Sequence, residues 1–247
     1  MTVLDRNFGT FNSTTSVTVT RSTGSFGTGT VIVVLIFGNT TFTTPSGWTQ
    51  RHNSVANLGL YAYDRTGAGE ASFGFTAGAA GSGQWHVWEL SAGSTYVTGG
   101  LFQEGSSSTT ALPGITPTAG NRHLLAVAGG TNSGASLSVT AFTNSFVLGA
   151  GGQATGQDRP FSYKGERDVT ADGTTSYGTT ATFSAATVGA AGGGILAYIN
   201  NAGDTTAPTV PTGLQTTAVG STTATLSWTA STDDVGVTGY ELQVTGP

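Results

Sequence analysis

The chain has 247 residues, no cysteine, and charge on only 9% of its residues, whereas an ordinary domain carries about 25%. Eight Lys and Arg against 13 Asp and Glu give a net charge of −5. The scattered arginines form no basic stripe, which argues against nucleic acid as a partner. Without cysteine there is no disulfide framework and no thiolate chemistry. Solubility must come from Thr, Ser, Asn and Gly, as in a folded, loop-rich protein.

The N-terminal residues 1–10 lack the basic region and apolar stretch of a secretory signal peptide. The longest apolar run, Val31 to Phe37, is far shorter than the about 20 residues needed to cross a membrane, so we expect no membrane insertion. An outward-facing composition without an export signal fits a virion protein that is made in the cytoplasm and released by lysis.

Nearly every structured segment up to residue 200 has the pattern of a β-strand. Residues 15–20 alternate, with Val17 and Val19 on one face and hydroxyls on the other. Residues 30–37 are continuously apolar, which predicts a central strand covered on both faces. Further strands are predicted at Trp48–Asn53, Leu58–Asp64, Ala71–Thr76, Trp85–Leu90, Arg122–Ala128, Leu137–Phe142, Phe146–Leu148, Arg159–Glu166, Tyr177–Phe183 and Gly194–Ile199.

More than ten short strands joined by glycine-rich turns predict an all-β fold, with a jelly-roll-type β-sandwich over residues 1–203. Each half of this region contains about five similar strands, so an internal duplication is an alternative. Because the halves share no motif at fixed spacing, we favour one sandwich. Residues 200–203, Asn-Asn-Ala-Gly, mark the end of this domain.

Residues 204–247 carry the pattern of a second domain. A proline-containing entry at Ala207–Pro211 is followed by a strand at Ala224–Trp228, a turn at 231–234 and a further strand ending at Tyr240. This segment resembles the opening of a fibronectin type III module, a small β-sandwich found in bacterial extracellular enzymes and phage tail proteins. The resemblance implies that Leu226, Trp228 and Tyr240 belong to its core.

A sandwich of this kind needs about seven strands, and this segment provides three. We therefore expect an incomplete fibronectin type III domain. Its apolar residues would be exposed if the protein ended at Pro247, so we expect either that the gene product continues or that a partner supplies the missing strands.

A second resemblance covers residues 28 to 200. The segments Thr44–Thr49, Leu60–Tyr63 and Phe73–Thr76, together with Ser176–Ile199, resemble a domain of actinobacterial phage virion proteins, typically minor tail proteins. It is a pattern of spacing and residue class without invariant chemistry. The resemblance implies a structural or adhesive role on a virion.

Catalytic and metal-binding patterns are weak. His52, His86 and His123 have no metal-ligand spacing, and no Gly-x-Ser-x-Gly nucleophile motif occurs. Glu166–Asp168 and Asp172–Gly173 are interpreted as a polar loop and a turn, and nothing selects one carboxylate pair for glycoside hydrolysis. We therefore expect no enzyme, no cofactor and no metal. The carboxylates considered are Asp64, Glu70, Glu89, Glu104, Asp158, Glu166, Asp168 and Asp172.

Aromatic side chains are the best candidates for binding, because a flat ring stacks on the apolar C–H face of a sugar. Trp48, Trp85, Trp88 and Tyr96 are the candidates for glycan contact or for a subunit interface. Trp85 and Trp88, three residues apart in one strand, should point to opposite faces. The alternative is that these rings fill the core.

Together these patterns lead us to expect a phage virion structural protein, most simply a minor tail protein. Its partners would be other virion subunits in a homo-oligomeric arrangement and a host cell-surface polysaccharide. Two alternatives remain open: a carbohydrate-binding module of a secreted polysaccharide-degrading enzyme, and a capsid decoration protein.

Overall fold

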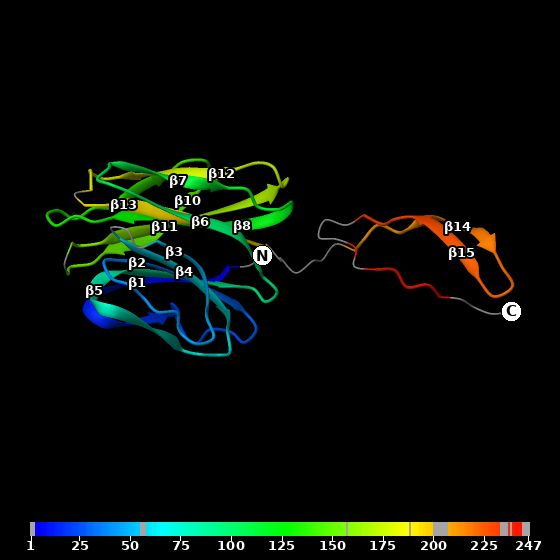
Figure 1. The fold of residues 1–247 in the computed structure, drawn as a ribbon, viewed down its shortest axis with the longest axis horizontal. Coiled ribbons are helices and arrows are strands. Elements are labelled where there is room, and N and C mark those ends of the chain that lie inside the picture. Colours follow the sequence, from blue (N-terminus) through cyan, green and yellow to red (C-terminus); the bar gives the residue numbers. More distant parts are fainter. Residues whose placement is uncertain are drawn as a thin grey trace. The chain divides into compact units, whose positions relative to one another are not determined.

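The computed structural model describes residues 3–54, 58–156, 158–187, 189–199, 207–232, 237 and 239–243. The chain divides into two compact units, Met1–Ala202 and Gly203–Pro247. Every regular element in the described residues is a strand, and all pairings are antiparallel, so the protein is all-β (Figure 1). In this part of the chain, no helix long and apolar enough to cross a membrane occurs. The predicted domain end at residues 200–203 lies outside the described residues.

The first half of the larger unit forms a five-stranded sheet in the order β1-β5-β2-β4-β3. The edge strand β1 and its neighbour β5 are long. Register shifts between Phe11 and Ser16 divide their pairing into two stretches, and the second stretch extends beyond the part of β5 that pairs with β2. The strands are β1 Val3–Thr20, β2 Val31–Gly38, β3 Thr49–Ser54, β4 Gly59–Thr66 and β5 Ser72–Leu90.

The second half forms a five-stranded sheet in the order β10-β11-β8-β13-β6 and a three-stranded sheet in the order β7-β12-β9. In Figure 1 these green and yellow strands stack on the blue and cyan strands of the first half. The strands are β6 Tyr96–Glu104, β7 Thr109–Ile115, β8 Gly120–Gly130, β9 Val139–Phe142, β10 Val147–Gln153, β11 Phe161–Ala171, β12 Tyr177–Phe183 and β13 Ala191–Ile199.

The two halves repeat one topology. Read from its other edge, the second five-stranded sheet is β6-β13-β8-β11-β10, which matches β1-β5-β2-β4-β3 strand for strand in chain order. The second stretch of the β1–β5 pairing, Ser16–Thr20 with Ser72–Thr76, corresponds to the pairing of β7 with β12. The bridge of Phe42 to Ala77 corresponds to the pairing of Phe142 with Ala181. Residues 1–202 therefore contain the same strand pattern twice, which agrees with the internal duplication that we kept as an alternative.

Three apolar clusters hold this unit together. One lies within the first half and contains Val17 and Ile36, and another lies within the second half and contains Phe161. The third joins the halves, because it contains residues of both five-stranded sheets, such as Trp88 and Leu196. The two sheets therefore pack face to face, and their burial of apolar side chains is the main stabilising contribution.

Strand β2 confirms the prediction of a central strand covered on both faces. Ile32, Val34 and Ile36 lie in the first-half cluster, whereas Val33 and Leu35 lie in the cluster between the halves. Because alternate residues of a strand point to opposite faces, a continuous apolar run is what such a position requires.

Other predictions needed correction. The N-terminal part of β1 and all of β6 and β7 were not predicted, and the strands predicted at Ala71–Thr76 and Trp85–Leu90 are one strand, β5. Glu166–Asp168 is part of strand β11 rather than a loop, because it pairs with β8. Asp172 does form the predicted turn, since its carboxylate accepts hydrogen bonds from the backbone N–H groups of Thr174 at 2.7 Å and Thr175 at 2.6 Å.

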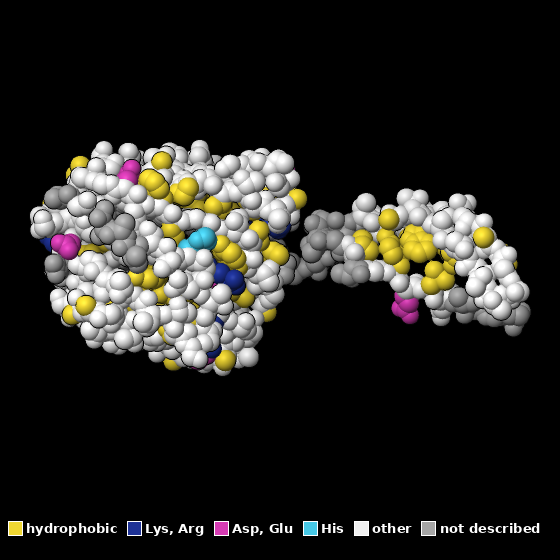
Figure 2. All heavy atoms as spheres, in the orientation of Figure 1, with side chains coloured by type: hydrophobic (Ala, Val, Ile, Leu, Met, Phe, Trp, Pro, Cys, Tyr) yellow, Lys and Arg dark blue, Asp and Glu magenta, His cyan; other side chains and the backbone are white. Residues whose placement is uncertain are grey.

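The smaller unit contains one hairpin in its described residues, β14 Thr212–Val219 and β15 Ala224–Thr229. The predicted strand ending at Tyr240 is not formed in the residues described there, and the predicted turn at 233–234 lies outside them. The Trp228 and Tyr240 rings meet edge to face at 5.4 Å, but these side chains remain 37% and 43% exposed. Leu226 is half-buried. The three predicted core residues gather together without forming a closed core, and Figure 2 shows an apolar patch on this unit.

Candidate functional site

The three tryptophans that we considered for glycan contact are buried. Trp48 and Trp85 belong to the first-half cluster and Trp88 to the cluster between the halves, with exposures of 8%, 6% and 0%. Trp85 and Trp88 do point to opposite faces, but apolar layers cover both faces of β5 at these positions. None of the three rings therefore offers a face to a sugar, which corrects this part of the prediction. Tyr96 differs, because it is half-buried and lines a groove.

We call this surface depression the Tyr96 groove. It has a volume of about 610 Å³ and lies along the edge of the interface between the two halves. Strands β2, β3 and β4 of the first half form one wall, and the start of β6 forms the other. Its lining is mainly hydroxyls and guanidinium groups: Val31, Gly47, Thr49, Arg51, Asp64, Arg65, Thr66, Ser94, Thr95 and Tyr96.

Asp64 is the fixed point of the Tyr96 groove. Arg51 Nε donates to its carboxylate at 2.8 Å, and the buried Tyr198 hydroxyl donates to it at 2.9 Å. The Arg51 guanidinium also lies over the Tyr96 ring, 4.7 Å from its centroid. A contact between the two halves therefore holds Arg51 and Tyr96 in place.

The Tyr96 hydroxyl forms a 2.6 Å hydrogen bond with His52 Nε2. Burial lowers the pKa of His52 and raises the pKa of Tyr96, so both groups are neutral around pH 7. The Tyr96 groove thus presents neutral donors and acceptors beside guanidinium groups, an arrangement suited to the hydroxyls of an uncharged ligand.

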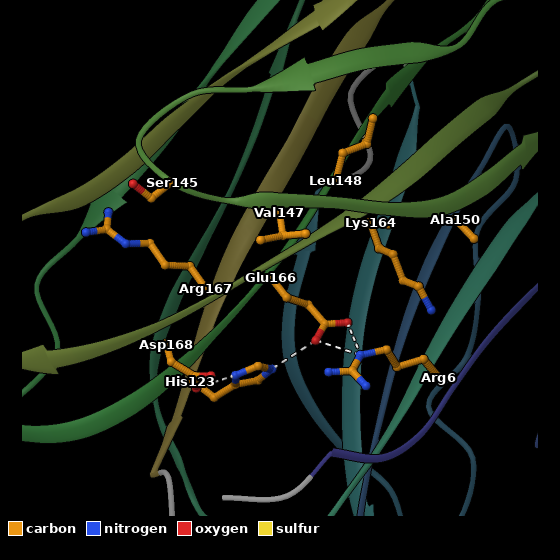
Figure 3. A pocket seen from close by; sticks show the side chains of 11 residues that line it. Arg6, His123, Ser145, Val147, Leu148, Ala150, Lys164, Glu166, Arg167 and Asp168 are labelled. Atoms are coloured by element: carbon orange, nitrogen blue, oxygen red, sulfur yellow. Dashed lines mark hydrogen bonds and ion pairs between the residues drawn. The ribbon is translucent and has the colours of Figure 1, made fainter.

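A second depression, the Glu166 groove, is lined by residues of both halves (Figure 3). Its volume is about 750 Å³. Strands β8, β10 and β11 of the second half supply most of its walls, and β1 supplies Arg6. It is lined by Arg6, His123, Ser145, Val147, Leu148, Gly149, Ala150, Lys164, Glu166, Arg167 and Asp168.

Glu166 occupies the centre of this groove, between His123 and Arg6 in Figure 3. Arg6 Nε donates to its two oxygens at 2.6 and 2.7 Å, and Trp88 Nε1 donates at 2.8 Å. His123 places Nε2 3.2 Å from Glu166 and Nδ1 2.7 Å from Asp168. Burial alone would raise the pKa of Glu166, but these hydrogen bonds lower it to about 2.

The two grooves occupy equivalent places in the repeat. Asp64 pairs with Val33, five residues before the end of β2, and Glu166 pairs with Leu125, five residues before the end of β8. Each carboxylate is followed by an arginine and lies opposite the first residue of the neighbouring strand. The equivalent residues, with the residue of the first half named first in each pair, are Val31 and His123, Thr49 and Val147, Ala62 and Lys164, Asp64 and Glu166, Arg65 and Arg167, and Thr66 and Asp168.

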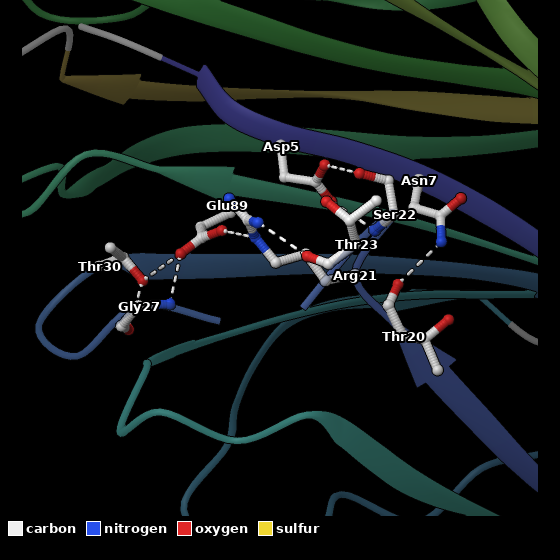
Figure 4. Close-up of polar contacts among 9 residues, drawn as sticks. All are labelled: Asp5, Asn7, Thr20, Arg21, Ser22, Thr23, Gly27, Thr30 and Glu89. Atoms are coloured by element: carbon white, nitrogen blue, oxygen red, sulfur yellow. Dashed lines mark hydrogen bonds and ion pairs between the residues drawn. The ribbon is translucent and has the colours of Figure 1, made fainter. Parts of the chain in front are cut away.

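Two further carboxylates, Glu89 and Glu70, are also engaged by neighbouring groups. Buried Glu89 accepts hydrogen bonds from Arg21 at 2.5 Å, the Gly27 N–H at 2.6 Å and the Thr30 hydroxyl at 3.0 Å (Figure 4). Glu70 pairs with Arg65 at 2.6 Å. Among the described residues, no group of three or more His, Cys, Asp or Glu is arranged to hold a metal ion.

Sequence reasoning missed both grooves, because each depends on strands that are distant in the chain. Two signals were present. An acidic residue followed by arginine occurs both at Asp64-Arg65 and at Glu166-Arg167, and Lys164 is the sole lysine of the chain.

Comparison with known proteins gives short matches. The chain is 74% identical over 39 residues to exoglucanase B of Cellulomonas fimi, 65% identical over 40 residues to chitinase A1 of Niallia circulans, and 51% identical over 43 residues to chitinase Chi52 of Paenibacillus xylanexedens. These matches cover 16%, 16% and 17% of this chain and only 4%, 6% and 8% of the respective relatives. No family model and no solved structure matches the chain.

These relatives correct the functional prediction. They are named as exoglucanases and chitinases, so the assignment to a phage virion, as a minor tail protein, is wrong, and so is the expected location in a virion. The alternative that we kept open, a module associated with polysaccharide-degrading enzymes, agrees better with the comparisons.

Proposed function

We propose that the chain is a non-catalytic, carbohydrate-binding part of an extracellular polysaccharide-degrading protein. In this proposal the unit from residue 1 to 202 binds polysaccharide, and the segment from residue 203 is a fibronectin type III-like connecting module. The partner is a neutral glucan or chitin chain, and the binding site is the Tyr96 groove.

The observation that carries the proposal is the similarity to exoglucanases and chitinases. The matched lengths of 39 to 43 residues are close to the length of the C-terminal unit, where the fibronectin type III resemblance was recognised. A segment shared among enzymes with different named substrates is expected of a connecting module rather than of a catalytic centre.

The Tyr96 groove supports the binding role. Sugars present hydroxyls that both donate and accept, and the groove offers the exposed Thr49 and Thr95 hydroxyls beside the Arg51 guanidinium. Because Asp64 and Tyr96 fix Arg51, little side-chain entropy is lost when a ligand binds. The volume of about 610 Å³ is within the range of ligand sites in proteins.

The state of Glu166 supports the non-catalytic role. Glycoside hydrolysis needs a carboxylic acid with a raised pKa to protonate the leaving group. The pKa of Glu166 is instead lowered to about 2, and its oxygens already accept hydrogen bonds from Arg6 and Trp88, with His123 Nε2 3.2 Å away. In the Tyr96 groove, Asp64 is the carboxylate and is similarly occupied by Arg51 and Tyr198.

Adsorption to insoluble polysaccharide tests the proposal. The full chain is mixed with microcrystalline cellulose or chitin, and the protein left in solution is measured. We expect depletion by at least one of the two, and a clear loss of depletion for Tyr96→Ala.

The matched control is Tyr163→Ala, which removes another half-buried tyrosine that packs against the second-half cluster, away from the Tyr96 groove. Circular dichroism confirms that both variants are folded. If the unaltered chain stays in solution with both polysaccharides, or if the two variants lose adsorption equally, the proposed site is wrong.

A further inference from the structure

Lys164 is an unusual residue of the Glu166 groove. It is the sole lysine of the chain, is only 3% exposed, and projects from β11 on the same side as Glu166 (Figure 3). Lysines are rarely this buried unless a partner neutralises them. Among the described residues, its ammonium has no hydrogen bond or ion pair, and its one specific contact is with the Trp88 ring, 5.8 Å from the centroid.

The carboxylates near Lys164 are already engaged. Glu166, two residues along the same strand face, accepts from Arg6 and Trp88 and lies 3.2 Å from His123 Nε2. Asp168 pairs with His123. The groove therefore contains a buried ammonium for which the protein supplies no counter-charge within ion-pair distance, and this is the position at which an anionic ligand would be stabilised.

The opposite wall of the groove is apolar. Strand β10 is an edge strand, and Val147, which is 71% exposed, points from it towards Glu166, whereas the Leu148 side chain lies on the other side of the strand (Figure 3). In Figure 3 this strand crosses the groove above Glu166 and Lys164. A ligand in the groove would therefore meet apolar side chains on one side and cationic groups on the other.

We propose that the Glu166 groove binds an acidic saccharide, with the carboxylate of a uronic acid residue paired to the Lys164 ammonium and its C–H face against Val147. An inorganic anion would leave the apolar wall unused, and a neutral sugar would leave Lys164 without a counter-charge. The inference rests on the proposed carbohydrate binding for the class of ligand, but it concerns a different groove.

The equivalent residue of the other repeat supports a ligand-directed role for Lys164. Ala62 occupies that position and is buried without charge in the cluster between the halves. The fold therefore does not need a cation there. Burial lowers the pKa of Lys164 to about 8, so the group is still mainly protonated at pH 7 although its surroundings disfavour the charge.

Lys164 can be observed directly, because a chain with a single lysine gives one lysine side-chain signal. The full chain is labelled with ¹³C-lysine and titrated at pH 7 with trigalacturonate. We expect the Lys164 ε-methylene resonance to shift in a saturable manner. The methyl-esterified trisaccharide, which lacks the charge, should leave it unmoved, and sulfate or a glutamate oligopeptide should need at least tenfold higher concentrations.

Calorimetry with Lys164→Met provides the second measurement, since methionine retains most of the buried volume. We expect Lys164→Met to bind trigalacturonate at least tenfold more weakly than the unaltered chain. The control variant, Arg159→Gln, removes a charge outside both grooves and should bind like the unaltered chain. An unmoved Lys164 resonance, or equal affinity of Lys164→Met, overturns the proposal. An equal response to the glutamate peptide or to sulfate overturns its saccharide part.

The outcome is separable from that of the proposed function. Adsorption of Lys164→Met to cellulose and chitin should equal that of the unaltered chain, because the Tyr96 groove is intact. If the unaltered chain adsorbs to polysaccharide but does not bind trigalacturonate, this inference alone is contradicted. Trigalacturonate binding without adsorption contradicts only the proposal for the Tyr96 groove.

Discussion

The Tyr96 groove and the Glu166 groove are two versions of one place in a repeated fold. Both have a carboxylate followed by arginine at the same register, and in both a ring of the other half donates to that carboxylate: Tyr198 to Asp64 at 2.9 Å, and Trp88 to Glu166 at 2.8 Å. The residues around the carboxylates differ. The shared feature therefore joins the halves, and the residues that differ give each groove its own lining.

The buried contacts between the two halves also differ: one set is polar and the equivalent set is apolar. Where β5 faces β11, Gln84 Nε2 donates to the Pro160 carbonyl at 2.7 Å and His86 bonds to the Ser162 hydroxyl at 2.8 Å. At the equivalent contact of β13 with β4 the buried residues include Leu60 and Leu196. Burial lowers the pKa of His86 to about 3, so it is neutral there. Directional hydrogen bonds on one side and apolar packing on the other fix the register of the halves.

The largest effect is expected from Trp88→Ala. This side chain is fully buried between the halves and donates to Glu166, so its loss leaves a cavity and removes one donor from a carboxylate. We expect the free energy of unfolding to fall by about 3–5 kcal/mol, measured by urea titration.

Two conservative variants separate the packing of these rings from their hydrogen bonds. Trp88→Phe and Tyr198→Phe keep most of the volume and each remove one ring donor, so each should cost about 1–2 kcal/mol. If Trp88→Ala costs no more than Trp88→Phe, packing at this interface contributes less than the structure implies.

The second effect is a gain in stability. Lys164→Met removes an ammonium whose pKa falls from 10.5 to about 8 in the folded protein. At pH 7 we expect a gain of about 3 kcal/mol, since one pKa unit corresponds to about 1.4 kcal/mol.

The difference in stability between Lys164→Met and the unaltered chain should depend on pH. Because the folded pKa lies below the unfolded one, the penalty is complete below pH 8 and disappears as pH rises to 10.5. The stability of the unaltered chain should therefore approach that of Lys164→Met over this range. A constant difference across it would contradict the assignment to Lys164.

The comparison also shows how far sequence reasoning reaches. Strands with strong apolar patterns were predicted closely, and β12 was predicted at its observed bounds, Tyr177–Phe183. The first part of β1 and β6 were missed because most of their residues are half-buried and do not alternate between apolar and polar. Such edge strands form through pairing with a distant partner, which local propensity does not encode.

The sites were less accessible to prediction for a related reason. Tyr96 was identified as a candidate, but its groove requires β3 and β6 to meet across two sheets. The tryptophans appeared as binding platforms because burial on both faces of β5 cannot be seen in one strand. The charge state of Lys164 depends on which carboxylates β1 and β8 neutralise beside it.

The third effect concerns acid. Glu166→Gln removes a carboxylate whose folded pKa is about 2, below the ordinary 4.5. The stabilisation by Glu166 is therefore complete above pH 4.5 and is lost as pH falls towards 2. We expect the variant to be about 2 kcal/mol less stable at pH 7, with the difference shrinking below pH 4.5 in urea titrations. A difference that grows on acidification would show that Glu166 is not held as a carboxylate.

The smallest effect on stability is expected where the two grooves differ at their rims. Val147→Thr places at the Glu166 groove the residue type that Thr49 supplies to the Tyr96 groove. Since Val147 is 71% exposed, the free energy of unfolding should change by less than about 0.5 kcal/mol.

Trigalacturonate affinity, in contrast, should fall severalfold in calorimetry, because a hydroxyl replaces an apolar contact with the C–H face of the sugar. Val210→Thr, an equally simple change at a residue 81% exposed in the smaller unit, is the matched control and should alter neither quantity. An affinity unchanged by Val147→Thr, with Lys164→Met still impaired, would mean that the charge alone selects the ligand and that the apolar wall of β10 takes no part.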